Sequence, residues 1–299
     1  MKPFIKHLPA LITAFFCAAA LIYGPITQPI DYHQFADQQT ILGIPHFADV
    51  LSNLGFALVA LWGWFQLKAS GQHPGISHGW AGYRLFLLGL FLTAFGSGYY
   101  HLDPDNIGLF WDRLPIALAC AGLLAGVWGD TQRKQSAPLA AALAVFGIAS
   151  VIWWYVTELS GMGDLRPYLL LQGLPIILIP LWQWLSGQAK ADRWAFGGAL
   201  LLYVFAKFTE QYDHEIATLL GILTGHTLKH ILATAAAAVA VVVAVLVLAW
   251  AALHERRQRR EYENELTAWI TALAHARTAS KALCWGSYRN VLVQPRQLI

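Results

Sequence analysis

The chain has 299 residues, of which 57% are hydrophobic and only 12% are charged. Ordinary soluble domains carry about 25% charged residues, so this composition excludes a soluble globular protein and indicates an integral membrane protein. The formal net charge of +3 comes largely from loops and the C-terminal tail, and a basic balance of that origin does not suggest a nucleic-acid partner.

Eight apolar runs are long enough to approach or span a hydrocarbon core, which needs about 17–25 helical residues. In chain order they lie near residues 8–25, 47–66, 83–101, 109–128, 138–157, 166–186, 194–210 and 225–252. The sequence shows no obvious fixed-period repeat and no strand-like alternation. We therefore predict an all-α polytopic membrane protein with an N-terminal transmembrane anchor (1–30), a seven-helix core (31–252) and a basic cytoplasmic tail (253–299).

Lysine and arginine accumulate in alternate connections between these runs, which orients the chain because basic residues favour the cytoplasmic side. They are Lys2 and Lys6, Lys68 and Arg84, Arg133 and Lys134, Lys190 and Arg193, and the HERRQRR run, with Arg166 the clear exception on the other side. Both termini are expected inside, and residues 30–45, 102–108 and 213–222 outside. A bacterial inner membrane is the expected location.

The first segment, LPALITAFFCAAALIYG, follows a basic start and is also compatible with a cleaved signal peptide. We favour an uncleaved anchor, because no convincing small-residue cleavage site is followed by the start of a mature domain. Cleavage would leave seven helices beginning outside, whereas retention gives eight beginning inside. Cys17, Cys120 and Cys284 offer no pair that suggests a structural disulfide.

Five polar residues fall within the predicted helices at one depth: Ser97 and His101 in SGYYH, Asp112 in WDR, and His226 and His230 in GHTLKH. Residues four apart on a helix share a face. On the predicted topology all five lie in the outer leaflet. Ionisable groups inside a membrane are costly and usually face the bundle interior, a cavity or one another, so we expect a shared site.

Three neutral imidazoles are a common catalytic ligand set for Zn²⁺ that leaves a fourth position for water. Bound metal lowers the pKa of that water to about 7. Asp112 beside the water can accept its proton and pass one to a leaving amine, and Ser97 can donate a hydrogen bond to a developing oxyanion. These parts predict amide or ester hydrolysis, with the seven-helix core as a hydrolase.

Each motif also has a plainer interpretation. A membrane HxxxH is also found in interhelical hydrogen bonding or haem ligation, and SxxxH is often a helix–helix polar contact. Asp112 and Arg113 are also compatible with an ordinary interfacial ion pair. Two other functional classes therefore stay open: a haem-binding electron carrier that uses the histidines as axial ligands, and a ligand-sensing receptor that keeps zinc as a structural element.

The order S-xxx-H, then D, then HxxxH on successive helices resembles the alkaline ceramidase family and its superfamily, which includes the progestin and adipoQ receptors. The resemblance covers roughly residues 31–250. It implies that His101, His226 and His230 hold zinc and that Ser97 and Asp112 complete a catalytic site. The implied partner is a membrane lipid, ceramide or another N-acyl lipid.

The segment FADVLSNLGF, with Asp49, Ser52 and Asn53, is similar to the start of the first core helix in that family, and we expect Asn53 to bind substrate. Helix capping and interhelical hydrogen bonding would explain the same residues. The family binds calcium through an Asp-Trp-x-Glu-x-Asn segment and a later Glu. Here only Asp31 matches that segment and His46 lies near the place of the later Glu, so the resemblance gives little support for calcium.

A further polar cluster precedes the last helix: Tyr203, Lys207, Glu210 and His214 at helical spacing, with Asp213 and Glu215 beside them. A solvated outer rim is the simplest interpretation. The alternative is a polar mouth that recognises a lipid headgroup, in which Glu210 would contact the substrate.

Overall fold

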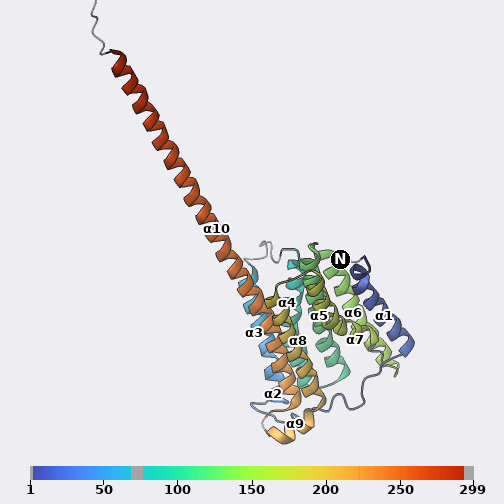
Figure 1. The fold of residues 1–299 in the computed structure, drawn as a ribbon. Coiled ribbons are helices and arrows are strands. Elements are labelled where there is room, and N and C mark those ends of the chain that lie inside the picture. Colours follow the sequence, from blue (N-terminus) through green and yellow to red (C-terminus); the bar gives the residue numbers. More distant parts are fainter. Residues whose placement is uncertain (1–2, 69–76, 222, 293–299) are drawn as a thin grey trace, which may run out of the picture. The chain divides into compact units, whose positions relative to one another are not determined.

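The protein is built from α-helices in a computed structural model that describes residues 3–68, 77–221 and 223–292 (Figure 1). The helices are α1 (Pro3–Tyr23), α2 (Phe47–Ser52), α3 (Leu54–Lys68), α4 (Trp80–Leu102), α5 (Asn106–Gln132), α6 (Ala137–Leu159), α7 (Arg166–Leu185), α8 (Lys190–Gln211), α9 (Asp213–Leu220) and α10 (Gly225–Leu292). All eight predicted apolar runs are helical. The expected inner loop at 69–76 and the tail end at 293–299 lie outside the described residues, as does residue 222.

Within the described residues, six helical segments are long and apolar enough to cross a membrane. They are Phe47–Leu67, Trp80–Leu102, Asn106–Gln132, Ala137–Leu159, Arg166–Leu185 and Gly225–Val242. The apolar part of α1, His7–Tyr23, is shorter, and α8 carries charged residues near both ends. The prediction of an all-α, polytopic membrane protein is confirmed.

The long last helix, α10, continues without interruption past the predicted boundary between core and tail at residue 252. The chain forms two compact units, Met1–Leu246 and Val247–Ile299. The first unit contains α1, which packs against α7, together with every residue of the predicted site. In the second unit, Leu266, Trp269, Ile270 and Leu273 are exposed.

The closest pair of helices in the first unit is α4 and α5, which pack through glycines. A Cβ atom added to Gly82 or Gly122 would clash with the backbone of the opposite helix. Small residues allow such close backbone approach between membrane helices. The connection between the two helices is short, and the Asp105 side chain accepts a hydrogen bond from the Gly108 amide at 2.6 Å, which caps α5. Asp112 is thereby held close to the end of α4.

Hydrogen bonds show which connections share an end of the bundle. At one end, the Leu165 amide donates to the Ile26 carbonyl at 2.8 Å and the Ala36 amide donates to Asp213 at 2.8 Å. At the other end, the Ser136 amide donates to the His78 carbonyl at 2.8 Å. The connections predicted to lie outside therefore meet at one end, where α2 and α9 lie in Figure 1.

Candidate metal centre

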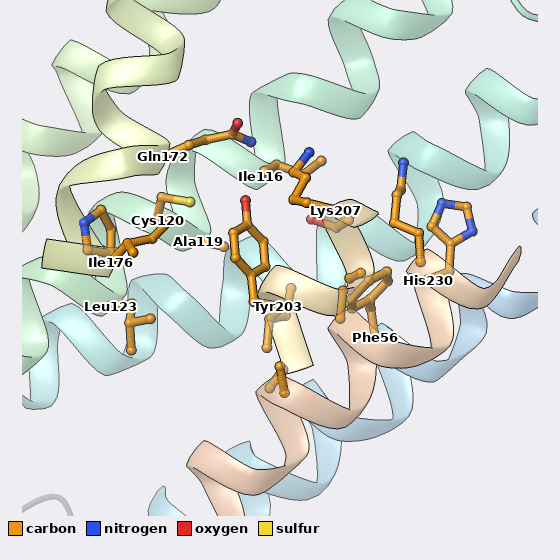
Figure 2. Close-up of a pocket in the computed structure, with 18 of the residues that line it drawn as sticks. Phe56, Ile116, Ala119, Cys120, Leu123, Gln172, Ile176, Tyr203, Lys207 and His230 are labelled. Atoms are coloured by element: carbon orange, nitrogen blue, oxygen red, sulfur yellow. The ribbon is translucent and has the colours of Figure 1, made fainter. Parts of the chain in front are cut away.

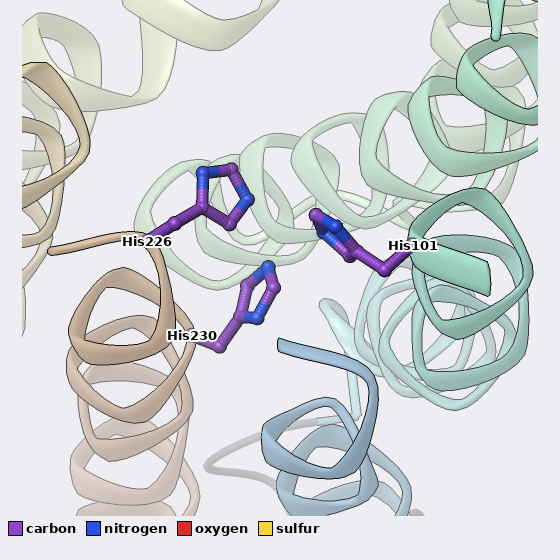
Figure 3. A group of neighbouring side chains, drawn as sticks. All are labelled: His101, His226 and His230. Atoms are coloured by element: carbon purple, nitrogen blue, oxygen red, sulfur yellow. The ribbon is translucent and has the colours of Figure 1, made fainter. Parts of the chain in front are cut away.

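Three buried histidines meet at the end of the bundle that carries α9 (Figure 3). His101 comes from the last turn of α4, and His226 and His230 come from the first turns of α10. Their ring centroids are 4.7 Å (His101–His226), 5.0 Å (His101–His230) and 4.8 Å (His226–His230) apart. One ligand atom from each ring lies within 4.8 Å of the others, so the group could hold a metal ion.

The unpaired ring nitrogens fit a metal ion. The Nδ1 atom of His101 and the Nε2 atom of His230 are buried and have no hydrogen-bond partner, whereas buried polar atoms normally have one. Ligands bonded tetrahedrally to one zinc ion at about 2.1 Å lie about 3.4 Å from one another. Small rotations of these side chains would close the triangle, so the donor set and the spacing both suit a nitrogen-coordinated metal.

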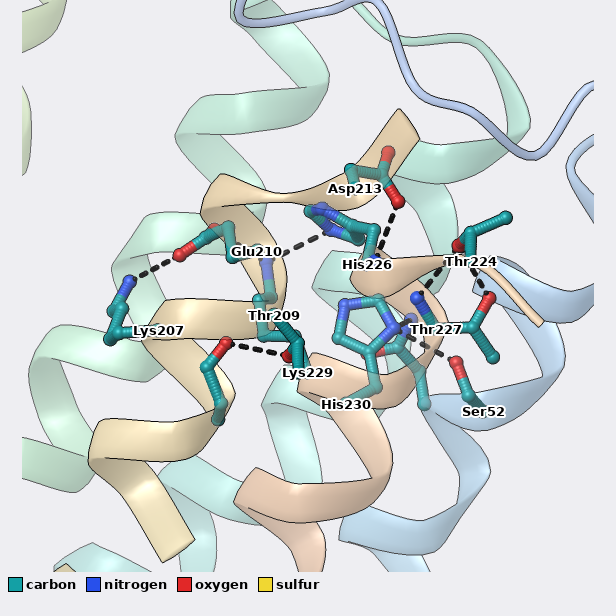
Figure 4. Close-up of polar contacts among 12 residues, drawn as sticks. Ser52, Lys207, Thr209, Glu210, Asp213, Thr224, His226, Thr227, Lys229 and His230 are labelled. Atoms are coloured by element: carbon teal, nitrogen blue, oxygen red, sulfur yellow. Dashed lines mark hydrogen bonds and ion pairs between the residues drawn. The ribbon is translucent and has the colours of Figure 1, made fainter. Parts of the chain in front are cut away.

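His230 is oriented from the other side by α2 (Figure 4). The Ser52 hydroxyl donates to the Asp49 carbonyl at 2.9 Å, and its oxygen lies 2.9 Å from Nδ1 of His230. Because the single hydroxyl proton is directed to the carbonyl, the Ser52 oxygen accepts from Nδ1–H. That leaves Nε2 unprotonated as a metal ligand. The amide nitrogen of Asn53 also lies 3.4 Å from Nδ1.

Two buried carboxylates hold the start of α10. Asp49, which is fully buried, accepts hydrogen bonds from the hydroxyls of Thr227 and Thr224. Asp213 accepts from the His226 amide at 2.7 Å and from the Ala36 amide at 2.8 Å. The free amides at a helix start need acceptors: Asp213 serves the His226 amide, and the Thr224 hydroxyl that Asp49 holds accepts from the Thr227 amide. These contacts fix the helix turn that presents His226 and His230.

The segment that precedes α2 covers the histidines. The ring centroid of Phe35 lies 4.6 Å from the ring centroid of His101 and 4.4 Å from the ring centroid of His226. Of the two positions considered for calcium, Asp31 is exposed, and His46 pairs through Nδ1 with the Asp37 carbonyl. The segment therefore contacts the histidine cluster through Phe35.

A chain of charged groups leads from α8 to His226 (Figure 4). Glu210 pairs with Lys207 and with Lys229, each at 2.8 Å. The Lys229 ammonium also lies 2.9 Å from Nε2 of His226. In this position Lys229 competes with a metal ion for Nε2, and Glu210 offers the ammonium an alternative partner. Tyr203 lies on the same cavity wall as Lys207 and Glu210, whereas His214 is exposed.

A cavity of about 350 Å³ opens beside the histidines, with His230 and Lys207 among its lining residues (Figure 2). Its charged lining comes from the ends of helices near the cluster, together with Ser97 and His230: Asp112, Arg113, Lys207, Glu210 and Lys229. Thr93, Gln172 and Tyr203 add uncharged polar groups. Its apolar lining comes from farther along the same helices and from α7: Leu90, Leu123, Ile176, Leu200, Ala236 and Ala240 among others. The cavity is therefore amphipathic, with the candidate chemistry at one end.

Ser97 and Asp112 both line the cavity, and the two side chains lie close enough to interact. The buried Oδ1 atom of Asp112 has no hydrogen-bond partner. The predicted role of Ser97 as an oxyanion donor stays a prediction.

All seven predicted site residues belong to this region. Asn53 contacts His230 and does not line the cavity, whereas Glu210 does line it. Sequence reasoning missed three contributors: the contact of Phe35 with the histidines, the link from Lys229 to His226, and the position of Arg113 on the cavity wall. Lys229 lies inside the GHTLKH motif, three residues after His226. This helical spacing could have predicted their contact.

Comparison of the chain with protein-family models, with curated proteins and with solved structures gave no match.

Proposed function

We propose that the protein is a zinc-dependent hydrolase that cleaves the N-acyl amide bond of a ceramide-like membrane lipid. The observation that carries the proposal is the position of Asp112. Asp112 lines the cavity that His230 also lines, its buried Oδ1 atom has no hydrogen-bond partner, and His230 belongs to a cluster of three buried imidazoles. Zinc is the proposed metal because three neutral nitrogen ligands are typical of its catalytic sites.

Each residue has a distinct task in this proposal. His101, His226 and His230 would hold zinc, which when bound acts as a Lewis acid and makes a water molecule acidic. Asp112 accepts a proton from the attacking water and delivers one to the leaving nitrogen. Ser97, which lines the same cavity, donates a hydrogen bond to the oxyanion that develops on the amide carbonyl. The products are a fatty acid and a free amine.

The cavity supports a lipid substrate. Its apolar lining is formed by residues of membrane helices α4, α5, α7 and α10 together with α8, and apolar walls with a few polar groups at one end suit an amphiphile. A substrate dissolved in the bilayer would enter between helices without crossing water. With the expected topology, the site faces the outer, periplasmic leaflet of a bacterial inner membrane.

The geometry favours this function over a haem-binding carrier. The three imidazole rings contact one another edge to face, and Phe35 packs directly against two of them, which leaves little space for a flat macrocycle between axial ligands. A zinc-containing receptor without turnover uses the same fold and is separated from the hydrolase by the activity measurement below.

Metal content tests the ligand set. Elemental analysis of purified full-length protein should give about one zinc per chain, as expected for a mononuclear three-histidine site. The double substitution His226→Ala and His230→Ala should remove most of it, whereas His7→Ala, at an exposed position on α1, should not. Full zinc retention in the double variant would exclude this ligand set, and a strong Soret band would favour haem.

The variant Asp112→Asn tests the chemistry apart from the metal. Release of fatty acid from N-acyl lipids should fall by about 10²–10⁴-fold, the usual contribution of a general base, while zinc content stays unchanged. Loss of zinc would make Asp112 a ligand or an essential support of one. Full turnover with zinc retained would refute the mechanism, and absence of turnover by wild-type protein on every N-acyl lipid would favour the receptor.

A further inference from the structure

Arg113 is a buried cation on the cavity wall. Its residue is 3% exposed, and its Nη1 atom is buried without a hydrogen-bond partner. No ion pair among the described residues includes it. Asp112, its neighbour in sequence, attracts the cation electrostatically, but adjacent residues on a helix do not face each other, and the two side chains form no ion pair.

Aromatic rings fix the orientation of the Arg113 guanidinium. Its Cζ atom lies 4.0 Å from the ring centroid of Trp154, 5.2 Å from that of Tyr32 and 5.6 Å from that of Tyr168. Such rings stabilise the cation through its face. The N–H donors lie in the guanidinium plane, and the unpartnered Nη1 atom among them can donate to an acceptor on a bound molecule.

The charges on the cavity wall do not balance. Lys207 and Lys229 share Glu210, and the lining as a whole carries three cations, Arg113 included, against the two carboxylates Asp112 and Glu210. A buried charge inside a membrane protein normally has a partner or marks a ligand site. An anionic group on a bound molecule would supply the missing charge.

We infer that the cavity selects amphiphiles that carry a carboxylate or phosphate group within a few bonds of the scissile amide. This inference rests on the proposed function, because it names the substrate class of the same site. The guanidinium binds either anion through two parallel N–H donors. Since Arg113 and Asp112 both line the cavity, an anion held by Arg113 shares that cavity with the nitrogen that Asp112 protonates. An N-acyl amino acid has this arrangement, and its hydrolysis gives a fatty acid and an amino acid.

The test compares pairs of lipids that differ in charge and share one acyl chain. The first pair is N-palmitoylglycine and the neutral N-palmitoylglycinamide; the second is phosphorylated and unphosphorylated N-palmitoylethanolamine. Full-length zinc-loaded protein in lipid nanodiscs should show kcat/KM at least about tenfold higher for the charged member of one pair, the size expected for a hydrogen bond to a charged group. The preferred pair identifies the anion as carboxylate or phosphate.

Substitution of Arg113 then tests whether this residue causes the preference for the charged substrate. Arg113→Gln should bring the ratio of kcat/KM for the charged substrate to kcat/KM for the neutral substrate close to one. Arg113→Lys should keep only part of the preference for the charged substrate. Arg84→Gln is the matched control, because Arg84 also stacks on a tryptophan, Trp64, with its Cζ atom 5.5 Å from the ring centroid, but does not line the cavity. It should leave the ratio unchanged.

Binding measurements separate this inference from the proposed function. If no N-acyl lipid is hydrolysed, the proposed function fails, and equilibrium binding of the same pairs to protein-containing nanodiscs, with empty nanodiscs as background, still measures the preference. Tighter binding of a charged member that Arg113→Gln abolishes supports the inference. Equal turnover and equal binding of both members of each pair by the wild-type protein would overturn it, whether or not the Arg113 variants fold.

Discussion

At the scale of single residues, the protonation of His230 is set by a serine on another helix. Ser52 donates to the Asp49 carbonyl and therefore accepts from Nδ1–H of His230. Hydrogen-bond partners behind a histidine fix its tautomer and strengthen its metal affinity. The same serine thus links the start of the first core helix to the metal centre.

Removal of this hydroxyl should weaken metal binding without removing a ligand. Ser52→Ala is expected to lower zinc affinity by about 10–100-fold, measured by competition with a chelator. Ser150→Ala provides the control, because Ser150 is a buried serine whose hydroxyl donates to a carbonyl of its own helix, α6, at 2.7 Å. Equal zinc affinity in the Ser52→Ala variant and wild type would show that Ser52 does not orient the histidine.

The histidines could be predicted from sequence, but their supporting contacts could not. His226 and His230 are four residues apart on one helix, and the depth of His101 followed from the topology. By contrast, the contacts of Asp49 with Thr227 and of Ser52 with His230 join residues about 180 positions apart. No local spacing encodes such contacts. Arg113 was considered as an ion pair with Asp112, whereas the structure surrounds its guanidinium with aromatic rings.

At the scale of helices, the close packing of α4 on α5 brings the two halves of the site together. Ser97 and His101 lie on α4 and Asp112 lies on α5. A Cβ atom at Gly122 would clash with the backbone of α4 at Phe86. Because the added methyl group would meet backbone atoms, the clash can be relieved only if the two helices move apart.

A methyl group at this contact should therefore reduce stability and disturb the site. Gly122→Ala is expected to lower the free energy of unfolding by about 1–3 kcal/mol, the usual cost of overpacking, as measured by unfolding in detergent micelles. Gly197→Ala on α8, where an added Cβ meets nothing within 4 Å, should be neutral or slightly stabilising. Similar losses in both variants would contradict the packing argument.

A second interaction between elements is the ion pair of Asp164 and Arg166, whose contribution to stability should depend on pH. Asp164, in the connection between α6 and α7, pairs with Arg166 at 2.8 Å, and Arg166 also donates to the Ala20 carbonyl of α1 at 3.1 Å. The Arg166 guanidinium holds the pKa of the Asp164 carboxyl well below its usual range. The pair thus orients the arginine that ties α1 to α7.

Because the pKa of Asp164 is lowered by folding, the carboxylate stabilises the protein above the unfolded pKa of about 4. This contribution is lost as pH falls through the lower pKa of the folded state. Unfolding in detergent measured from pH 7 down to pH 3 should show reduced stability of Asp164→Asn at neutral pH and a difference from wild type that narrows below about pH 4. A constant difference over the whole range would rule out this linkage.

Helix positions were predictable because apolar runs of this length have few alternatives in a membrane, but two helix ends were not. The first core run is divided at Asn53 into α2 and α3, where the Asn53 side chain donates to the Asp49 carbonyl at 2.8 Å. The last run continues through the charged HERRQRR segment, because lysine, arginine and glutamate are good helix formers in water as well.

At the scale of the whole chain, the distribution of charge distinguishes the two ends of the bundle in the first unit. Exposed acidic residues Asp103, Asp105 and Glu215 lie at the end that carries the histidine cluster, whereas exposed Arg133 and Lys134 lie at the opposite end. Since basic loops stay in the cytoplasm, the histidine cluster should face the outer leaflet.

Cysteine labelling in intact cells tests this orientation. In a background with Cys17→Ser, Cys120→Ser and Cys284→Ser, a cysteine introduced by Glu215→Cys should react with a membrane-impermeant maleimide before permeabilisation. A cysteine introduced by Arg133→Cys should react only afterwards; both positions are exposed, so burial does not bias the comparison. The reverse pattern would leave the histidine cluster and cavity unchanged but place them in the cytoplasmic leaflet. Substrate would then have to come from lipids on that side, and the positive-inside argument would fail for this chain.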